Sequence, residues 1–389
     1  MSPDREAPAG GAGAAPSGDL ALALGGGGAR AAYQVGVLRA LARRRPDLRV
    51  PLLTGVSAGA INAVGLAHHP GGFAEAVERL RSLWLALDTE RVFRTDLASL
   101  AWIALRWLTS LATGRSRLAP PPQGLVDTSP LRRFLEEALD CRDGRLGGVE
   151  ENLRSGRLRA LAITTTHYGT GRSITWVRGA GIEPWRRPHR EAVHGPIGLE
   201  HVLASAAIPV VFPAVRLGRE WHGDGGIRQI APLSPALHLG AARILTVSTR
   251  AAFPAANPDA REAEAYPAPA QIAGVLLNAV FLDMLDFDVM NLNRISALVS
   301  AGPGHEGLRP VRALVLRPSR DLAAVAAEHA WRLPRALRFL LHGLGTDERR
   351  SADLLSMILF EPPFIRRLIE LGESDTEEKA GDYDAFLDA

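Results

Sequence analysis

The chain has 389 residues, of which 47% are hydrophobic and 22% charged, enough for one large globular domain and an appendage. Its 45 basic and 42 acidic residues leave a net charge of +3. No basic run is interleaved with aromatic residues, so a nucleic-acid-binding protein is not favoured. The single cysteine, Cys141, excludes an internal disulfide framework and a cysteine-rich zinc site.

The N-terminal residues 1–18 are rich in Ala, Gly and Pro and lack the apolar core of a signal peptide. We therefore expect a disordered tail and a cytoplasmic location. The most apolar segment, 97–111, is too short for a membrane span and contains Arg106. We expect it to be a helix that either packs in the core or, through Trp102 and Trp107, forms a lid or touches a membrane surface.

The segment 20–63 predicts a strand, a glycine-rich loop, a helix, a second strand, a sharp turn and a second helix. The apolar run Leu20–Leu24 ends in four glycines, Gly25–Gly28. Residues 31–43 then show apolar side chains at helical spacing. The second apolar run, Val50–Leu53, leads into the turn. The first strand thus ends in free glycine amides, and the second strand ends in a serine.

Further along the chain, strands alternate with helices. The helices are expected at 73–87, 131–139, 199–207, 232–240 and 271–298, and the strands at 157–165, 173–177, 243–248 and 311–316. This alternation predicts a mostly parallel sheet covered on both faces. Residues 332–370 are expected to be helical again, and the acidic end from 372 is expected to be mobile.

A Gly-x-Ser-x-Gly motif, Gly55–Gly59, lies between a predicted strand and a predicted helix. In enzymes with this motif the serine sits on a tight, strained turn that presents its hydroxyl as a nucleophile. The alternative is an ordinary turn in which Ser57 is a helix N-cap. The strand before the motif and the helix after it favour the nucleophile.

The four glycines Gly25–Gly28 admit several interpretations. A dinucleotide-binding loop would need glycine in place of Ala31 and an acidic residue at the end of the second strand, which runs into Gly55. A P-loop would need a lysine, and Arg30 does not meet that pattern. A plain connecting loop is another alternative. Because a serine follows the next strand, we favour an oxyanion hole made of glycine amides at a helix N-terminus.

A nucleophilic serine needs a base. The lysine and histidine candidates lie in the acidic end, in helical patterns or too close to the serine: Lys379, His329, His342, His68 and His69. The remaining candidate is Asp224, which we place in a loop with glycines on both sides, residues 221–226. The alternative for this aspartate is an ordinary Asx turn.

In chain order these motifs resemble the patatin-like phospholipase family. The matching segments are Gly25–Arg30, Tyr33–Leu38, Gly55–Gly59 and Asp224–Gly226, together with Ala204–Pro209 and Phe212-Pro213. The resemblance covers about residues 20–235 and implies a three-layer α/β/α fold with a mostly parallel central sheet. It implies a catalytic domain over 19–318 and a helical C-terminal extension over 319–389.

The resemblance also implies a lipid acyl hydrolase that acts on phospholipids or other acyl esters with a serine–aspartate dyad, Ser57 and Asp224, and no histidine. Neither a metal nor another cofactor is required. The oxyanion hole would use the amides of Gly26, Gly27, Gly28 and Ala29, Arg30 would fix that loop, and the turns would depend on Gly55, Gly59, Gly225 and Gly226. The alternatives are a non-hydrolytic regulatory or acyl-lipid-binding protein on the same fold and an acyltransferase with the same dyad.

Two details of this site carry their own expectations. The family usually has glycine where this chain has Ala31. Alanine would cost about 1 kcal/mol if φ is positive there, but it is harmless at the start of a helix, which we favour. Asp224 needs an apolar setting to become a useful base, and Val211, Phe212 and Trp221 are nearby in the sequence.

Overall fold

The computed structural model describes residues 19–96, 124–251, 269–281, 283–302, 308–334 and 352–388, with Arg338 and a few residues between 99 and 109. The expected tail, 1–18, and most of the apolar segment 97–111, including Trp107, lie outside the described residues. Trp102 is described and is 60% exposed. None of the described helices combines the length and the apolar character needed to cross a bilayer.

A ten-stranded sheet forms the centre of the molecule, with the strand order β10-β9-β1-β2-β3-β4-β6-β5 and the hairpin β7-β8 attached through β8 to β3. The strands are β1 (Leu20–Leu24), β2 (Leu52–Val56), β3 (Ala160–His167), β4 (Arg172–Gly179), β5 (Arg186–Arg187), β6 (Arg190–His194), β7 (Val215–Leu217), β8 (Glu220–Asp224), β9 (Arg243–Val247) and β10 (Arg312–Leu316). The five strands from β10 to β3 are parallel, which confirms the predicted sheet.

Helices cover both faces of this sheet. They are α1 (Ala32–Arg44), α2 (Ala58–His68), α3 (Phe73–Leu85), α4 (Thr89–Val92), α6 (Ser129–Ala138), α7 (Gly147–Arg154), α8 (Leu199–Ser205), α9 (Ser234–His238), α11 (Pro269–Phe281), α12 (Met284–Ala301), α13 (Leu322–Ala327), α15 (Ala352–Ile358), α16 (Pro362–Glu378) and α17 (Ala380–Asp388). Short 3₁₀ turns are η1 (Gly28–Ala31), η2 (Gly225–Arg228) and η3 (Ala330–Arg332).

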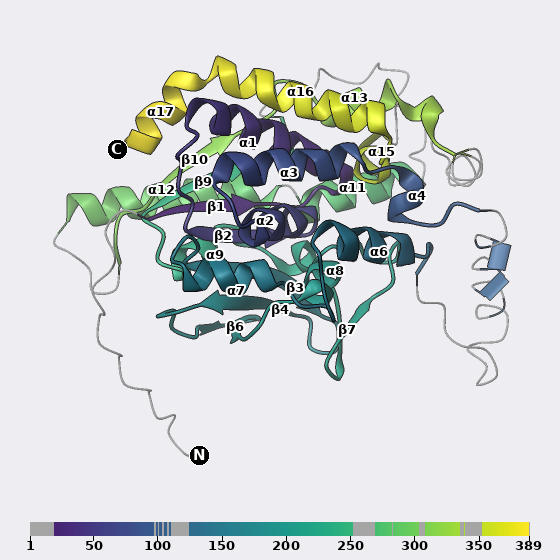
Figure 1. Cartoon of the computed structure of the whole chain (residues 1–389), viewed down its shortest axis with the longest axis horizontal. Coiled ribbons are helices and arrows are strands. Elements are labelled where there is room, and N and C mark those ends of the chain that lie inside the picture. The colour runs from purple at the N-terminus through teal and green to yellow at the C-terminus, as the bar shows by residue number, and fades with distance from the viewer. Residues whose placement is uncertain are drawn as a thin grey trace.

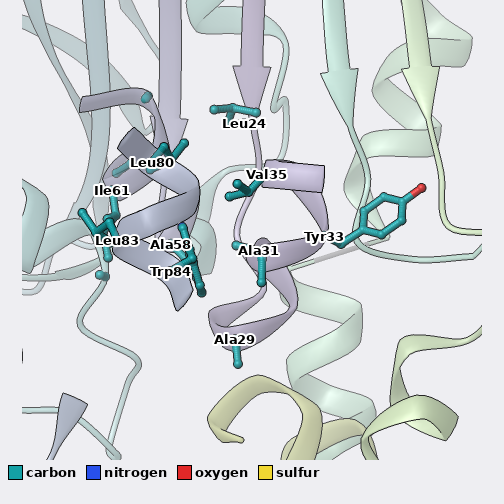
Figure 2. Packing of buried hydrophobic residues seen from close by; sticks show 14 of the residues in the cluster. Leu24, Ala29, Ala31, Tyr33, Val35, Ala58, Ile61, Leu80, Leu83 and Trp84 are labelled. Carbon is teal, nitrogen blue, oxygen red and sulfur yellow. The ribbon is translucent and has the colours of Figure 1, made fainter. Parts of the chain in front are cut away.

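The alternation of side chains along each strand separates two hydrophobic cores. On β1, Leu22 and Leu24 belong to the core shared with α1, α2, α3 and α16. Ala21 and Ala23 point the other way, into the core shared with α9 and α12. Figure 2 shows part of the first core, where side chains of α1, α2 and α3 gather beyond the end of β1. The expected three-layer α/β/α arrangement is therefore confirmed.

Two expected elements have different boundaries in the structure. The single helix expected over 271–298 is divided into α11 and α12, and Asp283 between them forms an ion pair with Arg250. The loop expected over 221–226 is wrong: residues 221–224 belong to strand β8 (Glu220–Asp224), and residues 225–226 begin the 3₁₀ turn η2. This strand pairs antiparallel with the end of β3, so the sheet places Asp224 instead of leaving it on a free loop.

The acidic C-terminal end, expected to be mobile, is helical and packs on the domain. Helix α16 lies along α1, with α3 beside them (Figure 1). A Cβ on Gly372 would lie 2.3 Å from the carbonyl oxygen of Tyr33, so the two helix backbones touch where they cross. Arg39 of α1 forms an ion pair with Glu373 of α16, and Arg45, which directly follows α1, pairs with Asp384 and Asp388 of α17. Leu371, Tyr383 and Phe386 of this end are buried in the first core, so apolar packing holds the segment on the domain and the ion pairs add to it.

Candidate active site

Ser57 occupies the turn between β2 and α2 in a strained conformation. Its φ of 57° and ψ of −135° lie in a region that non-glycine residues rarely adopt. The residue is 3% exposed. Although Ser57 stands at the N-cap position of α2, its side chain makes no capping hydrogen bond. The N-cap interpretation is therefore wrong, and the geometry is the sharp strand-to-helix turn that the motif predicts.

The glycines of the motif are needed because backbones approach closely here. A Cβ on Gly55 would lie 2.6 Å from the carbonyl oxygen of Gly59, and a Cβ on Gly59 would lie 2.2 Å from that of Leu24. Both distances are too short for any side chain. The motif thus lets the start of α2 contact the end of β1, which places Ser57 beside the glycine loop.

A contact that the sequence did not predict holds the backbone of Ser57. Its amide donates to the hydroxyl oxygen of Ser205 on α8 at 3.0 Å, and that hydroxyl donates to the carbonyl oxygen of Thr164 on β3 at 2.7 Å. Ser205 lies within a segment that resembles the family, but no local pattern indicates its partner. This relay connects the strained turn to α8 and to the neighbouring strand.

Asp224 is the last residue of β8 and is completely buried. It stands opposite Thr165 of β3, and its carbonyl oxygen accepts a hydrogen bond from the hydroxyl of Thr166 at 2.8 Å. The amide of Gly226 donates to Asp224 Oδ1 at 2.8 Å. Oδ2 has no hydrogen-bond partner of good geometry among the described residues. The Asx-turn alternative is thus partly right, but it uses only one carboxylate oxygen.

Burial raises the pKa of Asp224 from its ordinary value of 3.8 to about 7. The side chain of Ser57 and the amide of Gly226 act in the opposite direction and lower this pKa. The serine therefore lies near enough to interact with the carboxyl group, although their sequence positions are far apart. Gly225 contributes to this proximity, because a Cβ there would meet the side chain of Val56 at 2.9 Å.

The apolar surroundings expected for Asp224 are only partly those named from the sequence. Phe212 is 7% exposed and packs in the first core. Trp221 is 50% exposed, because successive side chains of β8 point to opposite faces and Trp221 faces away from Asp224. His222 does share the face of Asp224, and burial lowers its pKa to about 4. Its ring is hydrogen-bonded to Thr165 instead of the serine.

The glycine loop presents three amides that make no hydrogen bond to any described residue, those of Gly26, Gly27 and Gly28. Gly27 and Gly28 have φ values of 142° and 56°, which favour glycine. Ala31 has φ of −66° and lies in the helical region. The preferred interpretation of Ala31 is confirmed: the positive φ values fall earlier in the loop, and alanine causes no strain.

Arg30 connects the glycine loop to the C-terminal helices. The residue is 2% exposed and forms an ion pair with Asp353 at 2.9 Å, and its Nε donates to the hydroxyl of Ser356 at 2.7 Å. The carbonyl oxygen of Met357 approaches so closely that a Cβ on Gly28 would lie 2.1 Å from it. The family resemblance implies that Arg30 fixes the loop, and its partners on α15 became visible only in the fold.

A small apolar cavity of about 30 Å³ adjoins Ser57. Its walls include Ile61, Trp84, Phe134, Phe212 and Phe360. These side chains come from α2, α3, α6, the segment before β7 and the segment after α15. Gly28 of the glycine loop lines the same cavity, so the cavity connects the serine with this loop.

The chain is distantly similar to several solved structures. VipD from Legionella pneumophila matches with a TM-score of 0.38 and 14% identity over 93% of this chain and 66% of its own. Human GIVD cytosolic phospholipase A2 matches with a TM-score of 0.45 and 12% identity over 95% of this chain and 60% of its own. The complex of this enzyme with methyl gamma-linolenyl fluorophosphonate matches with a TM-score of 0.44 and 14% identity over 95% of this chain and 58% of its own. The chain thus spans about three fifths to two thirds of the length of these proteins.

No curated protein sequence matches the chain significantly. A model of the patatin-like phospholipase family does match, over residues 22–237. That range contains the glycine loop, the strained serine turn and Asp224, and it spans more than half of the chain. The chain therefore belongs to the patatin-like phospholipase family.

Proposed function

We propose that this protein is a lipid acyl hydrolase that cleaves phospholipids or related acyl esters through an acyl-enzyme on Ser57. One observation carries the proposal: β2 and β8 bring together a strained serine and a buried aspartate whose pKa is raised to about 7. The family match supports the substrate class. A metal or another cofactor is not needed for this chemistry.

The proposed reaction has two halves. Asp224 accepts the proton of Ser57 as the serine oxygen attacks the ester carbonyl. The protonated aspartic acid then returns that proton to the departing alcohol, which leaves an acyl-serine. In the second half Asp224 removes a proton from water as the water oxygen attacks the acyl-serine. The protonated aspartic acid then gives this proton to the departing serine oxygen, so that the fatty acid is released and Ser57 and the Asp224 carboxylate are regenerated.

The environment of Asp224 supports its role as the base. A general base works best when its pKa is close to the working pH, and an exposed aspartate, with a pKa near 4, is too weak. Here burial raises the pKa to about 7. The amide of Gly226 holds Oδ1, whereas Oδ2 makes no hydrogen bond of good geometry to any described residue and is available to accept the serine proton.

The glycine loop supports an oxyanion hole. The amides of Gly26, Gly27 and Gly28 are unused within the described chain, and they lie where a strand passes into a helical turn. Ala29 follows as the next amide. Donors of this kind, fixed before the reaction, stabilise the negative charge that develops on the carbonyl oxygen. The ion pair of Arg30 with Asp353 keeps the loop in place.

The apolar cavity beside Ser57 supports a fatty acyl substrate over a polar ester. At about 30 Å³ the cavity holds no more than a water-sized group, so an acyl chain has to displace the side chains around it. Phe134 and Phe360 are among these side chains. Contact with a membrane surface, one of the alternatives for the segment 97–111, would bring such substrates to the site.

The proposed function is tested by product analysis. Full-length protein is incubated with mixed phospholipid vesicles, and the lipids are separated, identified and quantified by mass spectrometry. We expect free fatty acid and lysophospholipid in equal amounts from the wild type. If an added alcohol collects the acyl group in place of water, the protein is an acyltransferase. If folded protein releases no product, it is a binding protein and the proposal fails.

We also predict that kcat/KM falls as the pH decreases below about 7, because only the carboxylate form of Asp224 can accept a proton. The decrease should be about tenfold per pH unit, with a plateau above about pH 8. The measurement is hydrolysis of a soluble chromogenic ester from about pH 5 to 9 with a metal chelator present. An acid limb centred near pH 4 would show that the aspartate is not perturbed in the working enzyme.

A further inference from the structure

A second cluster of reactive side chains lies on the same sheet, and the proposed hydrolysis does not use it. His167 of β3 stands directly opposite His222 of β8 in the antiparallel ladder. Glu220 lies two residues before His222, so it shares the same face of β8. The sequence indicated no metal-ligand cluster, because these residues become neighbours only when β8 pairs with β3.

The three side chains converge on one point. Nε2 of His222 lies 3.7 Å from Oε2 of Glu220, and Nε2 of His167 lies 3.8 Å from the same oxygen. All three potential ligand atoms lie within 4.8 Å of one another. Ligands about 2.0–2.1 Å from a tetrahedral zinc ion are roughly 3.3 Å apart, so small side-chain rotations would close the cluster around an ion.

The second nitrogen of each imidazole is already held by a threonine. Nδ1 of His222 is hydrogen-bonded to Oγ1 of Thr165 at 3.1 Å, and Nδ1 of His167 is hydrogen-bonded to Oγ1 of Thr170 at 2.6 Å. With the proton on Nδ1, each ring donates to its threonine and turns the lone pair of Nε2 towards Glu220. Histidines that bind metals are usually oriented in this way by a partner on the other ring nitrogen.

The burial of His222 provides an independent sign of a ligand site. The residue has no exposed surface, and its Nε2 has no hydrogen-bond partner among the described residues. Buried polar atoms without a partner are rare in proteins, and a bound ion would give this nitrogen the partner that it lacks. Glu220 has a side chain that is 60% exposed, so it can move towards the ion without disturbing the core.

We propose that His167, Glu220 and His222 bind one divalent transition-metal ion of the zinc type. Two imidazole nitrogens and one carboxylate oxygen form a ligand set that suits zinc and leave a fourth position for water. The ion would connect β3 to β8 two residues before Asp224, about 7 Å along the strand. Its role would be to fix the strand that carries the proposed base.

The test uses the full-length protein, freed of metal with a chelator and titrated with ZnCl₂ against a chromophoric competitor. We expect one tightly bound zinc per chain in the wild type. The variants His167→Ala and Glu220→Gln should bind at least about 100-fold more weakly, because loss of even an outer partner costs about 10–100-fold. His194→Ala, which removes an exposed histidine of β6, is the matched control and should bind as the wild type does.

Two further measurements separate loss of the site from loss of the fold. Cobalt(II) in place of zinc should give the visible absorption of a tetrahedral site in the wild type and the control only. Zinc should raise the unfolding temperature of these two proteins and leave that of Glu220→Gln unchanged. Equal zinc binding by Glu220→Gln and the control would overturn the proposal, as would no binding by the wild type. Ester hydrolysis is not a readout, so this result is independent of the proposed function.

Discussion

Ser57→Ala should reduce kcat for ester hydrolysis by at least about 10⁴-fold while the protein stays folded. In serine hydrolases the nucleophile and its base act as a unit, and removal of the nucleophile eliminates nearly all of the rate enhancement. Alanine has no hydroxyl but keeps the Cβ and tolerates the strained turn no worse than serine does. The measurement is steady-state hydrolysis of a chromogenic acyl ester, with circular dichroism to verify the fold.

Two controls sharpen this prediction. Ser155→Ala removes an exposed hydroxyl at the end of α7 and should leave kcat unchanged. An alkyl fluorophosphonate should label the wild type and Ser155→Ala covalently, and peptide mapping should place the adduct on Ser57. Labelling of folded Ser57→Ala at the wild-type rate would mean that another residue is the nucleophile.

Asp224→Asn should reduce kcat by about 10³–10⁴-fold, because an amide cannot accept the serine proton. The substitution keeps the size of the side chain, and the amide oxygen can still accept the hydrogen bond from Gly226. The residual activity should also lose its dependence on pH between about 5 and 8. Asp143→Asn, on an exposed turn, is the matched control and should behave as the wild type does.

The same variant should be more stable than the wild type at about pH 8. The pKa of Asp224 is raised on folding from 3.8 to about 7, so the stability associated with its protonated form is present below about pH 4. This stability is lost as the pH rises through about 7. At about pH 8 the buried carboxylate therefore costs up to about 4 kcal/mol, which a neutral asparagine avoids.

Chemical denaturation at about pH 8 and about pH 4 with a chelator present measures this difference. The gain in unfolding free energy should be largest at the higher pH and should shrink towards zero at the lower one. A variant that is inactive and also less stable at the higher pH would show that the carboxylate is held mainly by favourable contacts. Opposite changes in activity and stability would identify Asp224 as a residue kept for catalysis at a cost to stability.

Much of the site was visible in local sequence patterns. The turn at Ser57 follows from a strand, two glycines at fixed spacing and a helix, all within a few residues of the serine. The glycine loop was recognised in the same way, including the tolerance for Ala31 at a helical φ. These features depend on backbone geometry and side-chain spacing along a short segment, which the sequence records directly.

Other features depend on contacts between distant segments. The composition of the acidic C-terminal end predicted mobility, but arginines of α1 and the close crossing at Gly372 hold it against the domain. The partners of Arg30 lie on α15, more than 300 positions further along the chain. No periodicity or motif predicts such pairs, because Asp353 and Ser356 look like ordinary surface residues in the sequence and meet Arg30 only when α15 packs against the glycine loop.

The sequence alone thus determined the parallel α/β architecture and the strained turn at Ser57, and it singled out Asp224 as the candidate base. Only the tertiary structure decided the burial of that aspartate and therefore its pKa. The pairing of β8 with β3 removes Asp224 from water, raises its pKa to about 7 and places it near Ser57. The same pairing brings His167 opposite His222. Burial and cross-strand register are properties of the assembled sheet, and they give these residues the surroundings of the proposed base and of the proposed metal site.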